Sequence, residues 1–518
     1  SFKETLQSAV MHTSQFSMGV DVADVNNDAY PEIITMDMMP QDPYILKRSL
    51  DEDGYDLFNF KRSYGYMPQF AKNALQYNNK NGTFSETAMY SNVFATDWSW
   101  SALWLDFDND GWKDLFVSNG IPKRLNDIDY VNFVTNGSLQ NKIRANTVAE
   151  EDMLLIEKFP QIKLPNKFYL NKQSLKFADM ANQIQNDLPT YSNGAIYADL
   201  DNDGDLDIVV NNIDDNAIVY ENKTNHKKET HFAQIKLKGN LNNINAVGAK
   251  CIVYTKNEIR TYEKQPARGF QSSMEIPLHI GWNKQIPDSV LIVWPDNRYS
   301  KISLYNDSVF TVSYNQQLPY FDYANLSAKA NKLGKTFIDI SNSVAINYQH
   351  QENKFNEFDR EQLMPKMVSR EGPALAVADV NGDGLEDVFL GAAKTFKPAI
   401  YFQKKNGKFY QSQQTNLSND STYEDVDAAF VDVNNDNFPD LVVASGGNEY
   451  YGQSEYLQPR LYLNDGKGNF KKQMNAFPKE VLLTASCVKP NDFNNDGLID
   501  LFIGARAVAW VYCIKTNK

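Results

Sequence analysis

The feature that most constrains this chain is a nine-residue acidic segment that occurs six times in one frame. In the copy at residues 199–207, DLDNDGDLD, carboxylates stand at positions one, three, five and nine, and Gly204 stands at position six. Oxygen side chains at alternate positions that bend around a glycine can wrap a hard cation such as Ca²⁺. A single segment of this kind could equally be a turn stabilised by Asp and Asn side chains. Six copies in register favour the cation site.

The six copies share oxygen-bearing side chains at positions one, three, five and nine. In chain order they are Asp24, Asn26, Asp28 and Glu32; Asp106, Asp108, Asp110 and Asp114; Asp199, Asp201, Asp203 and Asp207; Asp379, Asn381, Asp383 and Asp387; Asp432, Asn434, Asp436 and Asp440; and Asp492, Asn494, Asp496 and Asp500. The second and third copies carry four carboxylates there and the others three, so we expect tighter binding in those two copies.

Position six should adopt a left-handed backbone, which suits glycine. It is glycine in four copies, Asn437 in the fifth and Ala29 in the first. Asparagine tolerates this conformation, whereas alanine does so poorly. The first copy is therefore the weakest candidate site.

The segments around the acidic copies predict β-sheets. Each copy is followed by a short apolar run of strand length, such as residues 115–117 or 501–503. Between copies, two short apolar runs flank a Gly- or Asn-containing turn, a pattern typical of a β-hairpin. The hairpins are predicted at residues 461–470, 168–177 and 400–409. A strand, an acidic loop, a strand and a hairpin make a four-stranded unit of roughly 40–60 residues, the size of a propeller blade.

The repeats predict four regions: blades with loop insertions at 1–228, a small all-β module at 229–316, a connecting segment at 317–372 and further blades at 373–518. The module interrupts the array, because no acidic loop occurs there and alternating strand patterns replace it at residues 232–237, 249–254 and 289–294. Insertions are expected at residues 38–73 and 121–165, the latter with a helix over residues 147–157. Binding usually resides in such surface loops. Whether the blades form one propeller or parts of two is left open.

Composition narrows the function. The formal net charge of −14 over 518 residues argues against binding to nucleic-acid backbones, and six divalent cations would largely neutralise it. Three widely separated cysteines give neither a disulfide framework nor a metal spacing. No apolar stretch is long enough to span a membrane, and no signal peptide is visible. Because the chain begins and ends within the repeat pattern, we expect it to be a fragment of a longer product.

The acidic segments resemble those of FG-GAP/VCBS repeat propellers, the type found in integrin α heads. The middle module resembles the ASPIC/UnbV domain at residues 246–250 (AVGAK), 268–273 (RGFQSS), 279–281 (HIG) and 293–295 (VWP). The combination is similar to the cartilage acidic protein family and its bacterial relatives. Residues 95–100 (ATDWSW) and 365–373 look most like surface proteins of Bacteroidota. The resemblance implies an all-β fold of propeller blades with an inserted small β domain.

The resemblance also implies the ligand set of each loop. The side chains at positions one, three, five and nine would bind Ca²⁺ together with the backbone carbonyl of position seven. Position seven is Tyr30, Trp112, Asp205, Leu385, Phe438 and Leu498 in the six copies. Ligands that are all oxygen, without His or Cys, favour Ca²⁺ over zinc or copper. We therefore expect up to six calcium ions.

Other candidate residues have structural interpretations that we favour. His279 is expected to be a structural imidazole rather than a ligand. Arg268 and the pair Ser272 and Ser273 could form an anion site, but a turn in the β module is the preferred interpretation. The tryptophans could stack on sugar rings, but their near-alternate spacing favours core packing. These tryptophans are Trp98, Trp100, Trp104 and Trp112.

Three functions remain open. The first is a non-catalytic, calcium-stabilised surface scaffold that binds another protein. By resemblance it would be a lipoprotein on the external face of a bacterial outer membrane, in a cell-envelope complex with a SusC/SusD-like TonB-dependent transporter. Membrane association would then come only from a lipid anchor or that partner. The second is a carbohydrate-binding module, and the third is a glycan-processing enzyme that uses paired acids. Because the repeat already explains every conspicuous carboxylate, we identify no catalytic residue.

Overall fold

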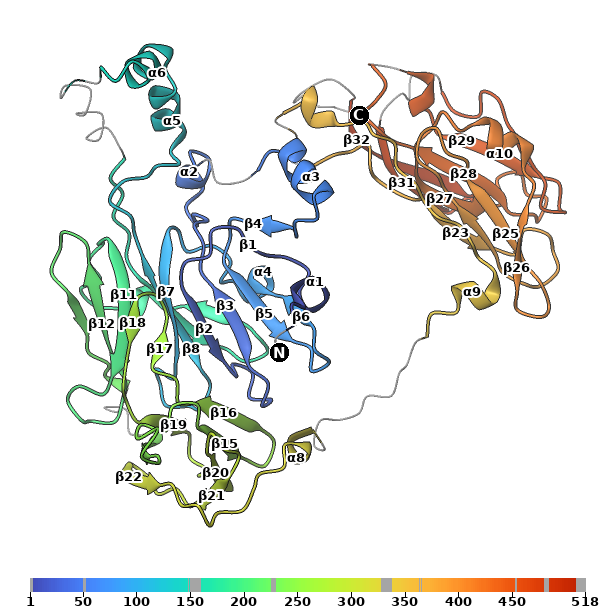
Figure 1. The fold of residues 1–518 in the computed structure, drawn as a ribbon. Coiled ribbons are helices and arrows are strands. Elements are labelled where there is room, and N and C mark those ends of the chain that lie inside the picture. The colour runs from blue at the N-terminus through green and yellow to red at the C-terminus, as the bar shows by residue number, and fades with distance from the viewer. Residues whose placement is uncertain are drawn as a thin grey trace. The chain divides into compact units, whose positions relative to one another are not determined.

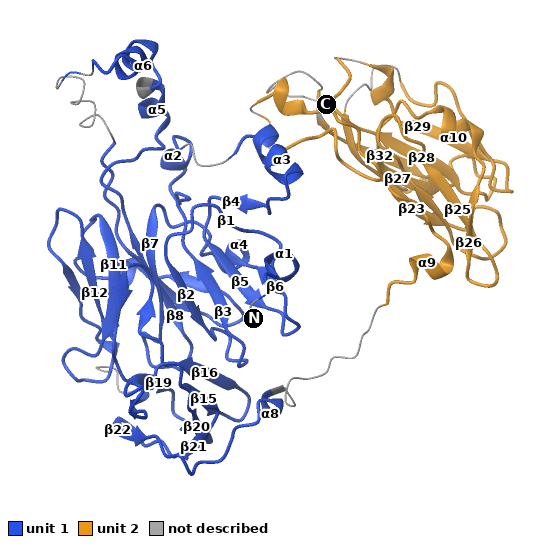
Figure 2. Ribbon diagram, viewed as in Figure 1, with its two compact units in different colours: residues 1–331 blue, residues 332–518 orange. Residues whose placement is uncertain are grey.

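The computed structural model describes residues 3–49, 53–147, 149, 160–224, 230–327, 338–362, 364, 366–451, 454–478 and 484–508. The chain divides into two compact units, Ser1–Asn331 and Lys332–Lys518, which are described separately (Figure 2). Unit 1 holds three repeat sheets and the β module, and unit 2 holds the remaining repeats (Figure 1).

The repeat sheets of unit 1 are antiparallel and are built on one plan. Two strands flank an acidic loop, and the next strand or hairpin pairs onto the second of them. The first sheet contains β2 (Val20–Ala23), β3 (Glu32–Thr35), β5 (Ala74–Asn78) and β6 (Phe84–Glu86); the second contains β7 (Ser99–Leu105), β8 (Asp114–Asn119), β9 (Lys167–Asn171) and β10 (Phe177–Asp179); and the third contains β11 (Ser192–Ala198), β12 (Asp207–Asn212) and β13 (Ile218–Tyr220).

The acidic loop fixes the register of each sheet, because position nine is the first residue of the second strand. Leu105 pairs with Asp114, and Ala198 pairs with Asp207. The first strands β2, β7 and β11 lie side by side, and the backbone N–H of Trp104 in β7 donates to Asp21 Oδ2 in β2 at 2.8 Å. Alternate side chains of neighbouring sheets share a core that includes Trp104.

Unit 2 repeats the plan. One sheet contains β23 (Leu375–Ala378), β24 (Asp387–Leu390), β25 (Ala399–Gln403) and β26 (Phe409–Ser412); the next contains β27 (Asp425–Val431), β28 (Asp440–Ser445), β29 (Arg460–Asn464) and β30 (Phe470–Lys472); and β31 (Thr484–Asn491) pairs with β32 (Asp500–Ala507). All three predicted hairpins are confirmed as β9–β10, β25–β26 and β29–β30. Phe389, Ile400, Leu441 and Tyr462 belong to the core of this unit.

The middle of the chain forms a small β module, as predicted. Its two main sheets have the strand orders β19-β14-β22 and β16-β15-β20-β21 and enclose a core with Trp282, Trp294 and Cys251. The strands are β14 (His231–Lys238), β15 (Lys250–Tyr254), β16 (Ile259–Glu263), β17 (Ala267–Arg268), β18 (Ser272–Ser273), β19 (Leu278–Trp282), β20 (Ser289–Val293), β21 (Tyr299–Ile302) and β22 (Ser308–Ser313).

Helices lie in the connections. They are α1 (Leu6–Ala9), α2 (Pro43–Leu46), α3 (Tyr55–Ser63), α4 (Ala88–Ser91), α5 (Ile128–Val134), α6 (Gly137–Arg144), α8 (Ala324–Ser327), α9 (Ser341–Val344) and α10 (Thr415–Asn419), with 3₁₀ turns η2 (Ala181–Gln183), η4 (Glu357–Asp359) and η5 (Glu455–Leu457). β1 (Thr13–Ser14) pairs in parallel with β4 (Gln69–Phe70). The helix predicted at residues 147–157 lies almost wholly outside the described residues. Within the described ranges, none of the helices has the length and apolarity needed to cross a bilayer.

Candidate functional site

All six acidic loops adopt one conformation, held by the same three hydrogen bonds. The N–H of position six donates to the carboxylate of position one, over 2.8–3.1 Å. The N–H of position seven donates to the side chain of position five, over 2.8–3.0 Å. The N–H of position two donates to the carboxylate of position nine, over 2.8–3.3 Å. The carboxylates are thus fixed around each loop by its own backbone.

Position six is left-handed in every loop, as predicted, and the φ values run from 66° at Asn437 to 91° at Gly111. Ala29 has a φ of 73°, the conformation that alanine tolerates poorly. Position four is also left-handed in every loop, with φ values from 55° to 73°, which the sequence interpretation missed. The signal for it was available, because position four is Asn or Gly in all six copies: Asn27, Asn109, Asn202, Gly382, Asn435 and Asn495.

The carboxylate at position nine ties its loop to the third strand of the sheet. Its second oxygen accepts from a strand N–H, for example from Asn171 to Asp114 at 2.7 Å and from Asn464 to Asp440 at 2.8 Å. Position nine therefore has a structural role that does not depend on a cation.

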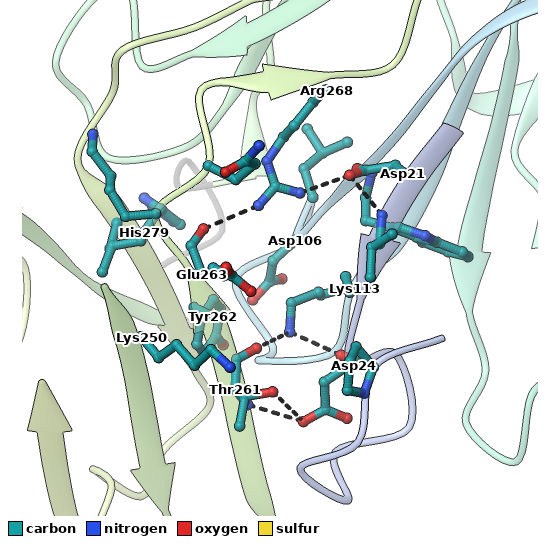
Figure 3. A pocket seen from close by; sticks show the side chains of 18 of the residues that line it. Asp21, Asp24, Asp106, Lys113, Lys250, Thr261, Tyr262, Glu263, Arg268 and His279 are labelled. Atoms are coloured by element: carbon teal, nitrogen blue, oxygen red, sulfur yellow. Dashed lines mark hydrogen bonds and ion pairs between the residues drawn. The ribbon is translucent and has the colours of Figure 1, made fainter. Parts of the chain in front are cut away.

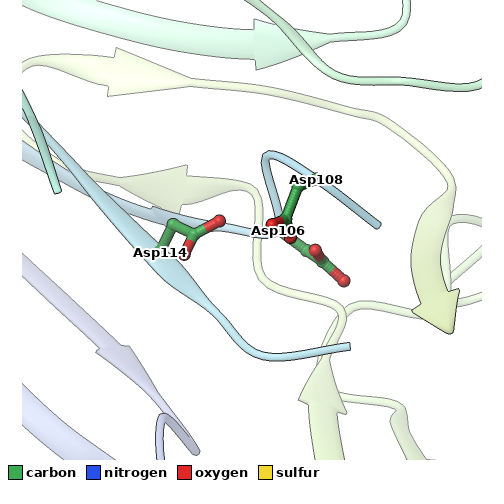
Figure 4. A group of neighbouring side chains, drawn as sticks. All are labelled: Asp106, Asp108 and Asp114. Carbon is green, nitrogen blue, oxygen red and sulfur yellow. The ribbon is translucent and has the colours of Figure 1, made fainter. Parts of the chain in front are cut away.

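The two loops with four carboxylates bring three of them together. In the second loop, the carboxylates of Asp106, Asp108 and Asp114 each place an oxygen within 4.8 Å of the others (Figure 4). In the third loop the same is true of Asp199, Asp201 and Asp203. The loops with most charge are thus also those with the closest clusters.

In the first loop, a lysine side chain from outside the loop forms an ion pair with one of the loop carboxylates. Lys80 Nζ lies 2.8 Å from Asp28 Oδ2, and Asn26 Nδ2 donates to the same oxygen at 2.9 Å. Asn434 and Asn494 make the equivalent bond to position five in the fifth and sixth loops. In these three loops, the asparagine at position three therefore donates a hydrogen bond to the carboxylate of position five. In the first loop, Lys80 would also compete with a metal ion for that carboxylate.

The β module covers the first three loops. Thr261 N donates to Asp24 Oδ2 at 2.9 Å, and Gln234 Nε2 donates to Asp199 Oδ2 at 2.5 Å. His279 Nε2 donates to Asn109 Oδ1 at 2.6 Å. Asp106 is consequently only 4% exposed. In the loops of unit 2 the middle positions are exposed, as are Asp201 and Asn202 of the third loop.

Burial raises the pKa of several carboxylates in the first and second loops. Burial, followed by repulsion from Asp110 and Asp108, raises the pKa of Asp106 well above its usual value. Burial and the neighbouring aspartate charges likewise raise the pKa of Asp114, and burial raises that of Glu32 to about 8. A cation among these groups would offset both the desolvation and the repulsion.

Two buried oxygens in the loops test whether a cation fits. Asp199 Oδ1, at position one of the third loop, and Asn26 Oδ1, at position three of the first, accept no hydrogen bond. Buried polar atoms normally have a partner, and here only a cation or water could supply one. The donor set is entirely oxygen, which suits a hard divalent ion.

The other candidate residues have structural roles. Arg268 pairs with Asp21 at 2.8 Å, and Ser272 and Ser273 form the short ladder of β17 and β18. His279 is buried, and burial lowers its pKa to about 4. Trp98 and Trp104 are buried, and Trp100 packs on Phe270 with ring centroids 4.8 Å apart. The preference for packing over sugar stacking is thus supported for these tryptophans.

A pocket of about 740 Å³ lies between the module and the first two acidic loops (Figure 3). Lys113 reaches across it and donates to the carbonyl oxygens of Asp24 at 2.9 Å and Thr261 at 3.2 Å. Burial lowers the pKa of Lys113 to about 8. Arg268 and Glu263 also line the pocket. Its size suits a small polar molecule, and Lys113, Lys264 and Arg268 in its lining are already bonded to protein atoms.

Fold and loops together define a β-repeat protein with an acidic, cation-compatible loop in each repeat and an inserted β module. Residues 50–117, 379–443 and 432–503 match the FG-GAP-like repeat family, and residues 239–317 match the ASPIC and UnbV family. The chain is therefore an FG-GAP repeat protein with an ASPIC/UnbV domain, and these repeats imply a β-propeller-like fold. The search of curated proteins gave no match.

These families point to a coarse function. FG-GAP and ASPIC/UnbV domains suggest a non-catalytic binding or scaffold role outside the cell. Both are generally non-enzymatic families, and FG-GAP repeats are typical of extracellular or surface proteins.

Proposed function

We propose that this chain is an extracellular scaffold whose acidic loops bind Ca²⁺ and thereby stabilise the blades that present its binding surfaces. The observation that carries the proposal is the common loop conformation, with carboxylates drawn together in the second and third loops. Calcium is the ion that such flexible, all-oxygen sites favour. Magnesium is less suited, because it keeps several of its waters.

Calcium should stabilise the fold measurably. One site occupied at a hundred times its Kd contributes about 2.7 kcal/mol of unfolding free energy. Removing calcium with EGTA should therefore lower the Tm by several degrees, and returning it should restore the Tm. A Tm that is the same in EGTA and in calcium would contradict the proposal.

Trp112 allows one loop to be observed directly. Its side chain stands at position seven of the second loop, beside the cluster of Asp106, Asp108 and Asp114. Tb³⁺ bound there should luminesce on tryptophan excitation, and calcium should quench the signal by displacement. Trp112→Phe should remove most of the luminescence but preserve the calcium-dependent Tm, because position seven would contribute only its carbonyl. Asp108→Asn should weaken both signals.

A second candidate function is glycan binding, favoured by aromatic side chains on the insertion around α3. Tyr44, Phe60, Tyr64 and Tyr66 are 58–71% exposed, and the rings of Phe60 and Tyr64 lie 4.8 Å apart. Exposed aromatic rings of this kind can stack on sugars or on a protein partner. Retention on a glycan array that is lost in Phe60→Ala and Tyr64→Ala would support glycan binding. Failure to bind any glycan would exclude this role.

We further propose that the protein acts at the outer-membrane surface of a bacterium, as a lipoprotein or bound to a partner such as a SusC/SusD-like TonB-dependent transporter. The support is the resemblance of residues 95–100 and 365–373 to Bacteroidota surface proteins. Affinity purification from native membranes followed by mass spectrometry tests it. Recovery of an outer-membrane transporter with the protein is the expected result, and its consistent absence would reject this partner.

A further inference from the structure

A second kind of acidic site lies in unit 2, at the ends of the strands opposite the acidic loops. Glu424 immediately precedes β27, whereas the acidic loop follows that strand at Asp432. Glu449 likewise follows the far end of β28, whose first residue closes the same loop. Glu352 comes from the segment that precedes the first sheet of the unit. The repeat pattern explains none of these three glutamates.

Glu424 is the most deeply placed of the three. It is 1% exposed, and its Oε2 accepts a hydrogen bond from Lys394 N at 2.7 Å. Its Oε1 is buried and has no hydrogen-bond partner. A buried carboxylate oxygen without a hydrogen-bond donor is unfavourable unless a cation or a proton compensates it.

The other two glutamates repeat this arrangement. Glu449 Oε1 accepts from Asn353 Nδ2, and Glu352 Oε1 lies 2.7 Å from His350 Nε2. In each case the second oxygen, Glu449 Oε2 or Glu352 Oε2, is buried and unpartnered. Each glutamate is thus held by one oxygen and leaves the other without a donor.

Gly447 shows that two of these side chains face each other. A Cβ atom at Gly447 would lie 2.6 Å from Glu449 Oε2 and 3.3 Å from Glu424 Cβ, so both glutamates border the space that this glycine leaves open. Burial, and after it the charges of Glu449 and Glu352, raise the pKa of Glu424 to about 9. The three carboxylates therefore form one electrostatic group.

The basic side chains nearby are occupied elsewhere. Arg460 pairs with Asp425, and Arg360 pairs with Glu361 at 2.5 Å. The amine of Lys394 stands over the ring of Tyr450, 3.9 Å from its centroid. Within the part of unit 2 that the structure describes, neither Glu424 nor Glu449 forms an ion pair with a lysine or arginine.

We propose that Glu352, Glu424 and Glu449 bind a divalent cation, Ca²⁺, through the three oxygens that lack a donor. The acidic loops show the same signature at Asp199 Oδ1, a buried loop oxygen without a partner. The glutamates are spaced more widely than the aspartates of the second loop, so binding draws them inward, and Glu352, with a side chain 29% exposed, has room to rotate. His350 would orient Glu352 through its hydrogen bond.

Such an ion would fasten the segment around residues 350–353 to one end of the sheet that contains β27 and β28. Asn353 already bridges this segment to Glu449. The ion would thereby order the face of unit 2 that lies opposite the acidic loops. It would bind independently of those loops, so its presence can be tested separately from theirs.

Native mass spectrometry of the full chain, stripped with EGTA and titrated with Ca²⁺, counts the ions. Glu424→Gln should lose one ion relative to wild type, because glutamine keeps an acceptor for Lys394 N but removes the charge. The double variant Glu424→Gln/Glu449→Gln should also lose one, since both residues serve one site. Adding Asp436→Asn, in the fifth loop, to this double variant should remove a second calcium ion. Glu455→Gln, at an exposed glutamate of the same unit outside the acidic loops, should lose none.

Thermal unfolding separates an ion from a shared proton. If the site binds calcium, Glu424→Gln should reduce the rise in Tm that calcium produces and have little effect in EGTA. An unchanged ion count in Glu424→Gln would overturn the proposal, as would an equal rise of its Tm in EGTA and in calcium. Glu352→Gln, at a side chain that is 29% exposed, gives the same test should Glu424→Gln fold poorly.

Discussion

The loops of unit 1 and the loops of unit 2 share one sequence pattern and one backbone conformation but differ in what covers them. Asp106 is buried beneath the module, where His279 bonds to the neighbouring Asn109. The equivalent loops beginning at Asp379, Asp432 and Asp492 have exposed middle positions. The local motif therefore sets the shape of the loop, and the module sets the environment in which its charges must be stabilised.

This difference implies a division of labour. In unit 1 the β module packs against the loops. The loop carboxylates accept hydrogen bonds from module residues such as Thr261 and Gln234. In unit 2 the carboxylates bond chiefly within their own sheet. A substitution at one loop position should thus have different consequences in the two units.

Position six gives the largest expected effect. A Cβ at Gly111 would collide with the guanidinium of Arg260 and lie 2.9 Å from Gly281 O, whereas a Cβ at Gly384 would meet nothing within 4 Å. Both glycines have left-handed backbones. Gly111→Ala should cost more than about 3 kcal/mol, because steric overlap adds to backbone strain. Gly384→Ala should cost about 1–2 kcal/mol from backbone strain alone.

Chemical denaturation in saturating calcium measures both free energies of unfolding. Equal losses for the two variants would mean that the module does not press on the second loop.

The pH dependence of unit 1 gives the next largest effect. His279 is buried, and burial lowers its pKa from 6.5 to about 4. Between these pH values the histidine is protonated in the unfolded chain but not in the folded chain. The free energy of unfolding therefore decreases as the pH falls from 6.5 to 4, and this contribution is fully present above pH 6.5. The contribution of His279 to this loss should reach about 3 kcal/mol.

Glutamine at position 279 provides the control. His279→Gln should flatten this part of the stability curve relative to wild type, with calcium held constant. Parallel curves for the two proteins would show that the imidazole is not sealed between the module and the second loop.

Position six of the first loop gives the smallest effect. Ala29 adopts a φ of 73° at a position where four loops have glycine. Ala29→Gly should raise the free energy of unfolding by about 1 kcal/mol, because it removes the left-handed strain. A matched Asn437→Gly change should give less, since asparagine tolerates this backbone better. Thermal unfolding shows whether the variant is more or less stable than wild type. A destabilised Ala29→Gly would contradict left-handed strain at this position.

The sequence predicted what is local. The six loops, the strands that flank them, the three hairpins and the small β module depend on residue patterns over a few positions, and all of them form. The left-handed residue at position six followed from its glycines, and the one at position four could have followed from its Asn and Gly residues. The helices α5 and α6 were not anticipated, because with seven and eight residues they are too short to show a helical repeat in the sequence.

What the sequence could not predict is long-range contact. His279 meets Asn109 across 170 positions of the chain, and Asp24 meets Thr261 across 237. Nothing in the local sequence around these residues indicates such a distant partner. The glutamates at 352, 424 and 449 are equally scattered in the sequence, and only folding brings their charges close enough to interact.

The packing of the module over the second loop affects the rate at which a bound ion can leave that loop. Asn109 is fully buried, and Gly281 sits so close to Asp106 that a side chain at that glycine would overlap its carboxylate. An ion seated in this loop would exchange more slowly than one in the exposed loops of unit 2, because Asp106 lies beneath the module. The second loop would then retain its ion for longer than those loops when external calcium falls.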